Sequence, residues 1–193
     1  MNALVLALVL AAPEPSTRTS VIEVGSPTVA RAALLFVLSP SVQVGAAASF
    51  DHSRFTHAPS LRFSAAGSVA MPMLVTAHRG ARTQLLLRIE PGAFLGAAPL
   101  GWGITLLLGL EVRVEVSRVV TLGGGVEVPT ALVMHPGYLF TVPVLFGPIV
   151  QWRVSDDARV FVRAKAGPGF MPAQVFSAPY FAFLATAGVA WDL

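Results

Sequence analysis

Hydrophobic and polar residues alternate along residues 101–134, on both sides of a tight turn. Between Thr105 and Ser117 every even position is leucine or valine, whereas the odd positions are mostly glycine, charged or small polar residues. Only an extended strand sends successive side chains to opposite faces, because a helix would mix the two sets. The alternation resumes after the turn near Ser117-Arg118. This segment therefore predicts a β-hairpin with one apolar face and one charged face.

The same two-residue period recurs from Val29 to the end of the chain. It predicts about eight strands, over residues 29–51, 61–75, 82–90, 105–117, 120–134, 138–154, 159–170 and 180–193. Proline cannot donate a hydrogen bond to a neighbouring strand, so Pro143 and Pro148 predict a bulge or a break within 138–154. Leu139, Leu145 and Ile149 share the parity of the polar face in that strand and are expected to point inward.

The predicted connections alternate in length along the chain. Short turns fall near 77–80, 117–118 and 155–157, and longer loops near 51–60, 94–101, 134–137 and 171–179. Up-and-down barrels of the outer membrane have this arrangement, and a tilted strand of about 9 to 11 residues crosses the bilayer. Both termini are then expected on the periplasmic side.

Composition agrees with a membrane environment. The chain of 193 residues is 54% hydrophobic and 12% charged, against roughly 25% charged residues in globular proteins, and its mean hydropathy is +0.71. One domain is expected. The absence of cysteine leaves no disulfide and no thiolate metal site, and we expect no metal and no cofactor. The net charge of +3 comes from scattered residues without a basic run, which argues against a nucleic-acid partner.

The N-terminal residues predict a signal peptide. Residues 1–12, MNALVLALVLAA, form an apolar run too short to span a bilayer, and Ala11-Ala12 offer a cleavage point before Pro13. Residues 13–28, rich in proline, serine and threonine, are expected to be a lead-in. The barrel is expected over 29–193.

Two stretches carry a family resemblance: GPIVQWRVSDDARVFVRAKAGPGF, over 147–170, and the ending AGVAWDL. With the repeated strands, they resemble the small eight-stranded outer-membrane β-barrels of the OmpA and OmpX type, over roughly residues 29–193. The resemblance implies an all-β fold, a single up-and-down antiparallel transmembrane barrel, in the outer membrane of a Gram-negative-type bacterium. It implies outer-membrane lipids and the barrel-assembly machinery as partners. Family members end in an aromatic residue that this machinery recognises. Here Trp191 and the final Leu193 occupy the place of that signal.

The structural alternative is a polytopic helical membrane protein. Uncharged runs at 32–50, 91–110, 128–150 and 166–190 approach the length of a helical span. Prolines interrupt two of these runs at a density that would break helices repeatedly, and polar residues recur at every second position. The pattern favours the barrel.

Charged residues on the inward parity predict a cluster in the lumen. The interior of an eight-stranded barrel is filled by side chains, and buried charges are stable only when paired. The expected lumen cluster is Arg31, Arg62, Arg88, Glu90, Glu111, Arg113, Glu115, Glu127, Arg153, Arg159, Arg163 and Lys165.

Aromatic residues near the predicted strand ends indicate interfacial girdles. The expected girdle is Phe36, Phe50, Phe63, Trp102, Phe140, Trp152, Phe170, Phe181 and Trp191.

These features predict a monomeric envelope protein with a structural or small interaction role and a largely closed, salt-bridged lumen. A narrow, porin-like pore for small solutes or anions is the alternative. We expect no enzyme and no catalytic residue. A lipid deacylase built on His52-Ser53 or His57-Ser60 is a further alternative, which lacks oxyanion donors and has only Asp51 nearby as an orienting carboxylate.

Overall fold

Every regular element in the described part of the chain is a β-strand. The structure is a computed structural model and describes residues 18–26, 28–52, 64–171 and 179–193. Within those residues, no helix has the length and apolar character needed to cross a membrane. The strands are β1 (Arg18–Ser26), β2 (Thr28–Ser39), β3 (Val42–His52), β4 (Ala65–Ala70), β5 (Met73–Arg79), β6 (Thr83–Ala97), β7 (Gly101–Glu115), β8 (Val120–His135), β9 (Leu139–Pro143), β10 (Leu145–Arg153), β11 (Ala158–Phe170) and β12 (Tyr180–Asp192). The all-β prediction is confirmed.

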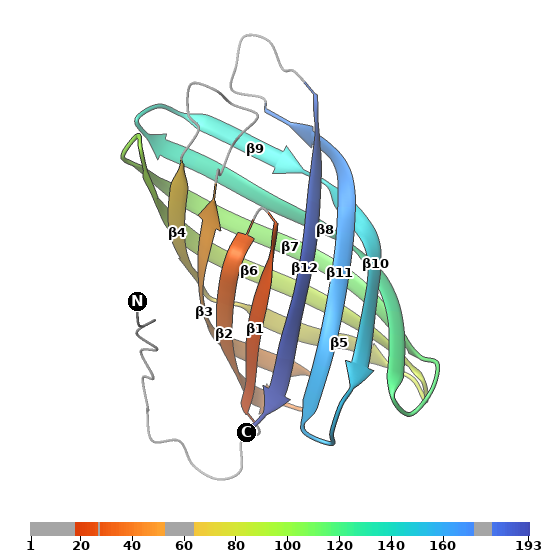
Figure 1. The fold of residues 1–193 in the computed structure, drawn as a ribbon. Helices are drawn as coiled ribbons and strands as arrows, with labels where there is room; N and C mark the ends of the chain where they lie inside the picture. Colours follow the sequence, from red (N-terminus) through yellow and green to blue (C-terminus); the bar gives the residue numbers. More distant parts are fainter. Residues whose placement is uncertain (1–17, 27, 53–63, 172–178) are drawn as a thin grey trace.

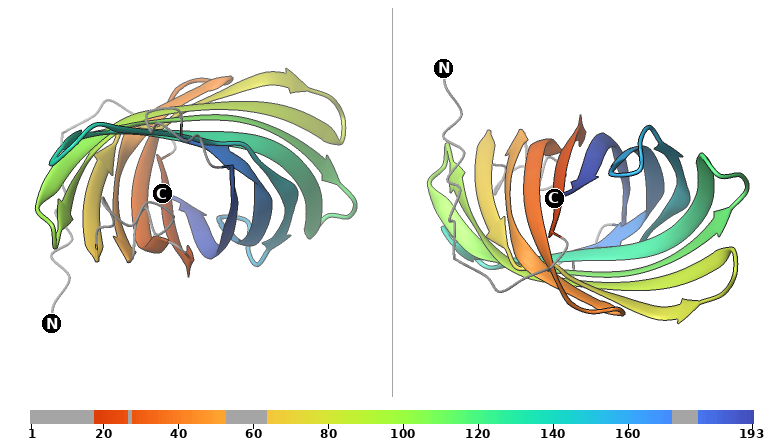
Figure 2. Two further views of the ribbon diagram at one scale, coloured as in Figure 1. Left: turned by 90° about the horizontal axis from the view of Figure 1, so that it is seen from above. Right: turned by 90° about the horizontal axis from the view of Figure 1, so that it is seen from below.

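The strands pair antiparallel into one closed barrel (Figures 1 and 2). β12 returns to pair with β1, where Ser20 lies opposite Trp191. β4 and β5 both pair with β3 and β6, so they share one position in the wall. β9 and β10 share another position, between β8 and β11. The twelve described strands therefore fill ten positions around the barrel.

The prediction of about eight strands is wrong, because the barrel has ten strand positions. One additional strand is β1, which lies inside the range 13–28 that the sequence indicated as a lead-in. The other arises because 29–51 is a hairpin, β2 and β3, joined at Pro40-Ser41. A register shift between Val37 and Ser39, next to this two-residue turn, leaves the same parity facing outward on both strands, so the alternation continues across it.

Tight turns gather at one end of the barrel. This terminal end carries Arg18 and Leu193, whose backbones exchange two hydrogen bonds of 3.3 and 2.7 Å. Its turns are residues 40–41, 80–82, 116–119 and 154–157. We call the opposite end the loop end, where the described connections are residues 98–100 and 136–138. The short turns predicted near 77–80, 117–118 and 155–157 are confirmed, but the longer loops predicted near 94–101 and 134–137 are wrong, because the connections at 98–100 and 136–138 are as short as the turns.

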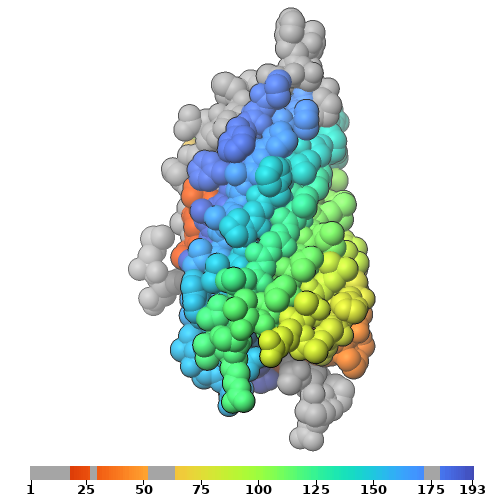
Figure 3. Space-filling model, turned by 90° about the vertical axis from the view of Figure 1, so that its right-hand side faces the viewer, coloured from red at the N-terminus to blue at the C-terminus, as the bar shows by residue number. Residues whose placement is uncertain are grey.

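The outer surface of the wall is apolar. On β7 the outward residues are each 38–49% exposed, namely Trp102, Ile104, Leu106, Leu108, Leu110, Val112 and Val114. The strands run obliquely across the face, as their bands of colour show (Figure 3). A tilted wall with apolar residues outside and polar residues inside is the arrangement that lipid requires of a barrel, because strand pairing satisfies backbone polar groups within the wall.

Prolines in the wall coincide with gaps in strand pairing. Pro143 ends β9, and Val144 separates it from β10. Pro129 of β8 and Pro168 of β11 flank this break on either side, and Val144 N donates to Pro168 O at 2.8 Å. Pro148 lies where the described register between β10 and β11 is interrupted. The predicted break at Pro143 is confirmed, since proline removes the hydrogen bond that continuous pairing needs.

Candidate functional site

Charged side chains of the barrel interior form one connected ring. They project from alternate, inward positions of β1, β2, β6, β8 and β11. We call this set the ion-pair ring: Glu23, Arg31, Arg88, Glu90, Glu127, Arg163 and Lys165.

One half of the ring connects β11, β1, β2 and β6. Arg163 Nη1 lies 3.4 Å from Glu23 Oε1, and the same oxygen lies 3.3 Å from Arg31 Nη1. Arg31 Nη2 donates hydrogen bonds of 3.0 Å to both carboxylate oxygens of Glu90. Residues far apart in sequence are thereby tied together inside the lumen.

The other half returns from β6 through β8 to β11. Arg88 Nη2 lies 2.5 Å from Glu90 Oε2, and Arg88 Nη1 lies 3.6 Å from Glu127 Oε1. Glu127 Oε1 also pairs with Lys165 Nζ at 2.9 Å, and the Lys165 side chain is completely buried. The series closes because Lys165 and Arg163 both lie on β11.

Two further ion pairs lie nearer the terminal end. Glu111 pairs with Arg113 on β7. Arg159 Nη2 donates to both oxygens of Asp192, at 2.8 and 2.7 Å, and Thr19 Oγ1 donates to Asp192 Oδ1 at 2.7 Å. Asp192 therefore joins β11, β12 and β1 at the seam where the barrel closes.

The loop end of the lumen is filled by apolar side chains. Phe94, Val133, Leu139 and Met171 form one buried cluster, and Tyr180 packs against it. We call these five residues the apolar plug. Val133 and Leu139 have no solvent exposure, so the lumen is blocked on this side of the ring.

A cavity of about 410 Å³ occupies the other side of the ring. Its lining runs from the ring residues to Ser39, Pro40 and Ser41 at the β2–β3 turn. The cavity therefore reaches the terminal end, while the apolar plug closes the loop end. The lumen is a one-sided chamber in the described part of the chain.

The structure brings nine of the predicted lumen residues into ion pairs: Arg31, Arg88, Glu90, Glu111, Arg113, Glu127, Arg159, Arg163 and Lys165. Glu115 and Arg153 are instead exposed at strand ends, and Arg62 lies outside the described residues. The sequence analysis missed Glu23 and Asp192 as partners. For Glu23 a signal existed, because it alternates with the outward Ile22 and Val24.

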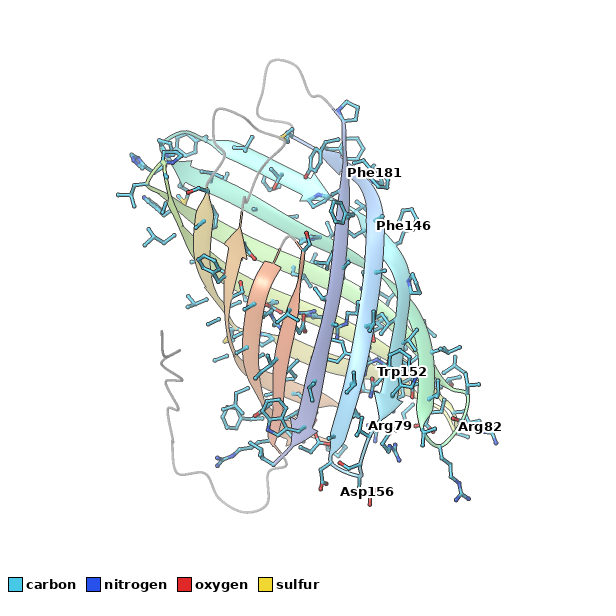
Figure 4. The ribbon with its side chains drawn as sticks, in the orientation of Figure 1. Arg79, Arg82, Phe146, Trp152, Asp156 and Phe181 are labelled. Atoms are coloured by element: carbon cyan, nitrogen blue, oxygen red, sulfur yellow. The ribbon has the colours of Figure 1, made fainter. Side chains whose placement is uncertain are left out.

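The predicted girdle residues lie at two levels. Phe50, Trp102, Phe140, Phe170 and Phe181 lie toward the loop end of their strands, whereas Phe36, Trp152 and Trp191 lie toward the terminal end. In Figure 4, Phe181 and Phe146 project from the upper wall and Trp152 from the lower wall, above the charged Arg79, Arg82 and Asp156. Phe146 is an aromatic residue that the prediction omitted. Phe63 lies outside the described residues.

The histidines form no cluster in the described residues. His78 and His135 are exposed at opposite ends of the barrel. The side chain of His52, and the whole of Ser53, His57 and Ser60, lie outside what the structure describes. Among the described residues, no group of three His, Asp or Glu side chains is arranged to hold a metal ion.

One solved structure of an outer-membrane barrel shares this fold, and two others align with the chain at lower similarity. The outer-membrane protease OmpT from Escherichia coli aligns with 96% of this chain and 99% of its own, at 9% identity and a TM-score of 0.55. OmpT, an outer membrane protein of Vibrio cholerae, aligns with 85% of this chain and 55% of its own, at 11% identity and a TM-score of 0.43. The KdgM porin aligns with 92% and 99%, at 6% identity and a TM-score of 0.39. No family model matches the chain, and neither does any curated protein.

The chain therefore has the fold of an outer-membrane β-barrel protein. The finer resemblance to OmpA- and OmpX-type barrels gains no support, since no family model matches and the wall has ten strand positions. One further prediction is corrected. We expected from the sequence that the protein is not an enzyme, but the first of these structures is a protease on the same fold. At 9% identity that likeness extends to the fold alone.

Proposed function

We propose that the protein is an integral outer-membrane barrel whose lumen is closed to solutes in its resting state, with a structural or small interaction role in the envelope. The observation that carries this proposal is the ion-pair ring backed by the apolar plug. Seven charged side chains span the lumen, and Val133 and Leu139 are fully buried beyond them. A solute would have to displace both layers, and each is stable only when fully packed or paired.

Location in the outer membrane of a Gram-negative-type bacterium is part of this proposal. The apolar outer wall and the two levels of aromatic residues support it. The predicted signal peptide at 1–12 would supply export, and that segment lies outside the described residues.

We also propose a monomer that the barrel-assembly machinery inserts. Every position of the described wall pairs on both sides, so the barrel offers no free strand edge to a second copy. Trp191 lies in the closing strand β12, and Leu193 is 68% exposed just beyond it. Such a C-terminal segment is available to an assembly factor before the barrel closes.

Planar-bilayer recording tests the closed lumen. Wild-type protein is expected to insert without discrete conductance steps, with insertion checked by the change in gel mobility on boiling. The variant Phe94→Ala/Leu139→Ala, which empties the apolar plug, serves as the positive control and is expected to conduct intermittently. Regular conductance steps from wild-type protein would refute the closed lumen.

A narrow anion pore is the second candidate. The observation that favours it is the basic character of the cavity, which has seven cationic and three carboxylate side chains in its lining. In the same recordings, a pore of this kind would show steps with selectivity for chloride over potassium.

A further inference from the structure

The cavity at the terminal end has a surplus of positive charge. Its lining contains Arg31, Arg79, Arg88, Arg113, Arg159, Arg163 and Lys165, against Glu23, Glu111 and Glu127. The lining therefore carries four more cations than anions. A surplus of this size in a confined space attracts negatively charged ligands, because low-dielectric walls focus the field into the opening.

In two of the ion pairs that line the cavity, the cation is the more exposed partner. The side chain of Arg113 is 23% exposed against 13% for Glu111, and that of Arg163 is 14% exposed against 8% for Glu23. Arg113, Arg159 and Arg163 line the same cavity, so three like charges repel one another within one confined space. An anion among them would relieve that repulsion and accept hydrogen bonds from guanidinium groups suited to carboxylate.

Apolar side chains lie between the polar and charged ones on the opposite part of the wall. Val21, Ala33, Leu35, Val37, Leu74 and Leu86 line the cavity from β1, β2, β5 and β6. Arg113, Arg159 and Arg163 line it from β7 and β11, across the barrel. The lumen of a water-filled barrel is normally polar, so the apolar side chains in this lining favour an occupant other than water. A ligand with an apolar body would cover these apolar side chains and remove their surface from water.

We propose that this cavity is a binding site for a small organic anion, with its acidic group at Arg113, Arg159 and Arg163 and its apolar body against the β1–β2–β5–β6 wall. The volume of about 410 Å³ lies within the range of roughly 300–1,000 Å³ typical of small-molecule sites. The apolar plug makes the site accessible from the terminal end. The site lies on the terminal side of the apolar plug and shares Arg163 with the ion-pair ring.

Calorimetric titration with an aromatic acid tests the ligand class. The protein is placed in phosphatidylcholine nanodiscs, and empty nanodiscs give the blank for partition into lipid. We expect 1-naphthoate to bind saturably with one molecule per barrel. The uncharged 1-naphthamide and the cationic 1-naphthylmethylammonium are expected to bind at least about tenfold more weakly than 1-naphthoate. A hydrogen bond to a charged group contributes about that factor to the affinity.

Substitutions locate the site. Arg113→Gln is expected to weaken 1-naphthoate binding about tenfold, whereas Arg153→Gln, which makes the same charge change on an exposed residue outside the lining, leaves it unchanged. Glu111→Gln removes a competing carboxylate and is expected to tighten 1-naphthoate binding. This variant, with the opposite expected change in affinity, still tests the site if Arg113→Gln does not fold. Binding that is equal for the three probes, or equal losses in Arg113→Gln and Arg153→Gln, would overturn the proposal. Conductance by a barrel that still binds 1-naphthoate would count against the closed lumen alone.

Discussion

Replacing Glu127 with Gln removes the carboxylate that neutralises the most buried charge of the ion-pair ring. Glu127 is 4% exposed and lies 2.9 Å from Lys165 Nζ and 3.6 Å from Arg88 Nη1. The substitution preserves side-chain volume, so no cavity forms. Arg88 keeps its pair with Glu90 at 2.5 Å, but Lys165 is left buried without a counter-charge. Breaking a buried pair in this way costs about 3–5 kcal/mol, and the free energy of unfolding should fall by about that amount.

Urea unfolding in lipid vesicles, followed by tryptophan fluorescence, measures this change. The matched control is Glu115→Gln, which removes an exposed carboxylate at the end of β7 and is expected to change stability by about 0.5 kcal/mol or less. The double variant Glu127→Gln/Lys165→Met removes both charges and should recover most of the loss. If Glu127→Gln is no less stable than Glu115→Gln, the ring does not stabilise the barrel as argued.

Three further predictions concern the wall of the barrel, and vesicle unfolding measures each of them. Gly147→Ala should destabilise the barrel by about 1–3 kcal/mol or more, because the new methyl group overlaps a backbone carbonyl of β11. Gly67→Ala is the control and should be nearly neutral, because no described atom lies within 4 Å of the new methyl group. Equal effects of the two substitutions would contradict the close approach of β10 to β11. Leu108→Arg, at the centre of β7 on its outer face, should cost about 2–4 kcal/mol and Val116→Arg, beyond its terminal end, about 0–1 kcal/mol; the reverse order would misplace the membrane. Asp192→Asn should cost about 1 kcal/mol, because the carboxylate that accepts three hydrogen bonds at the closing seam is about one-third exposed, and an unchanged midpoint would show that the seam does not depend on it.

The alternation of residues was enough to predict the wall. Inward and outward faces follow from parity alone, so the sequence by itself assigns Glu111, Arg113 and Lys165 to the lumen and Leu108 to the outer face. The inward placement of Leu139, Leu145 and Ile149 is confirmed, since these side chains are 0%, 4% and 3% exposed.

The number of strands could not be predicted for a specific physical reason. At Pro40-Ser41 a two-residue turn joins β2 to β3 with Ser39 opposite Val42, and a register shift between Val37 and Ser39 restores the parity, so that Val37 lies opposite Gln43. The alternation therefore contains no interruption to mark the turn. β1 escaped detection because its segment begins among proline, serine and threonine residues that also predict a loop.

The ion-pair ring depends on register and closure, which alternation does not encode. Arg163 reaches Glu23 only because β12 pairs with β1 and brings together residues 140 positions apart. Parity assigns each charge to the lumen but leaves its height along the barrel undetermined. The cavity was missed for the same reason, since its apolar wall comes from inward residues that the sequence does not distinguish from packed ones.

A spin-label scan along β7 tests the central claim most directly, namely that alternate residues face lipid and the lumen of a closed barrel. The chain has no cysteine, so single cysteines introduced from position 104 to 115 can each carry one nitroxide. In lipid vesicles, we expect collisions with dissolved oxygen to be frequent at even positions and rare at odd positions, with a period of two. A period near 3.6, or low accessibility at every position, would contradict the account, because the first indicates a helix and the second a covering layer of protein.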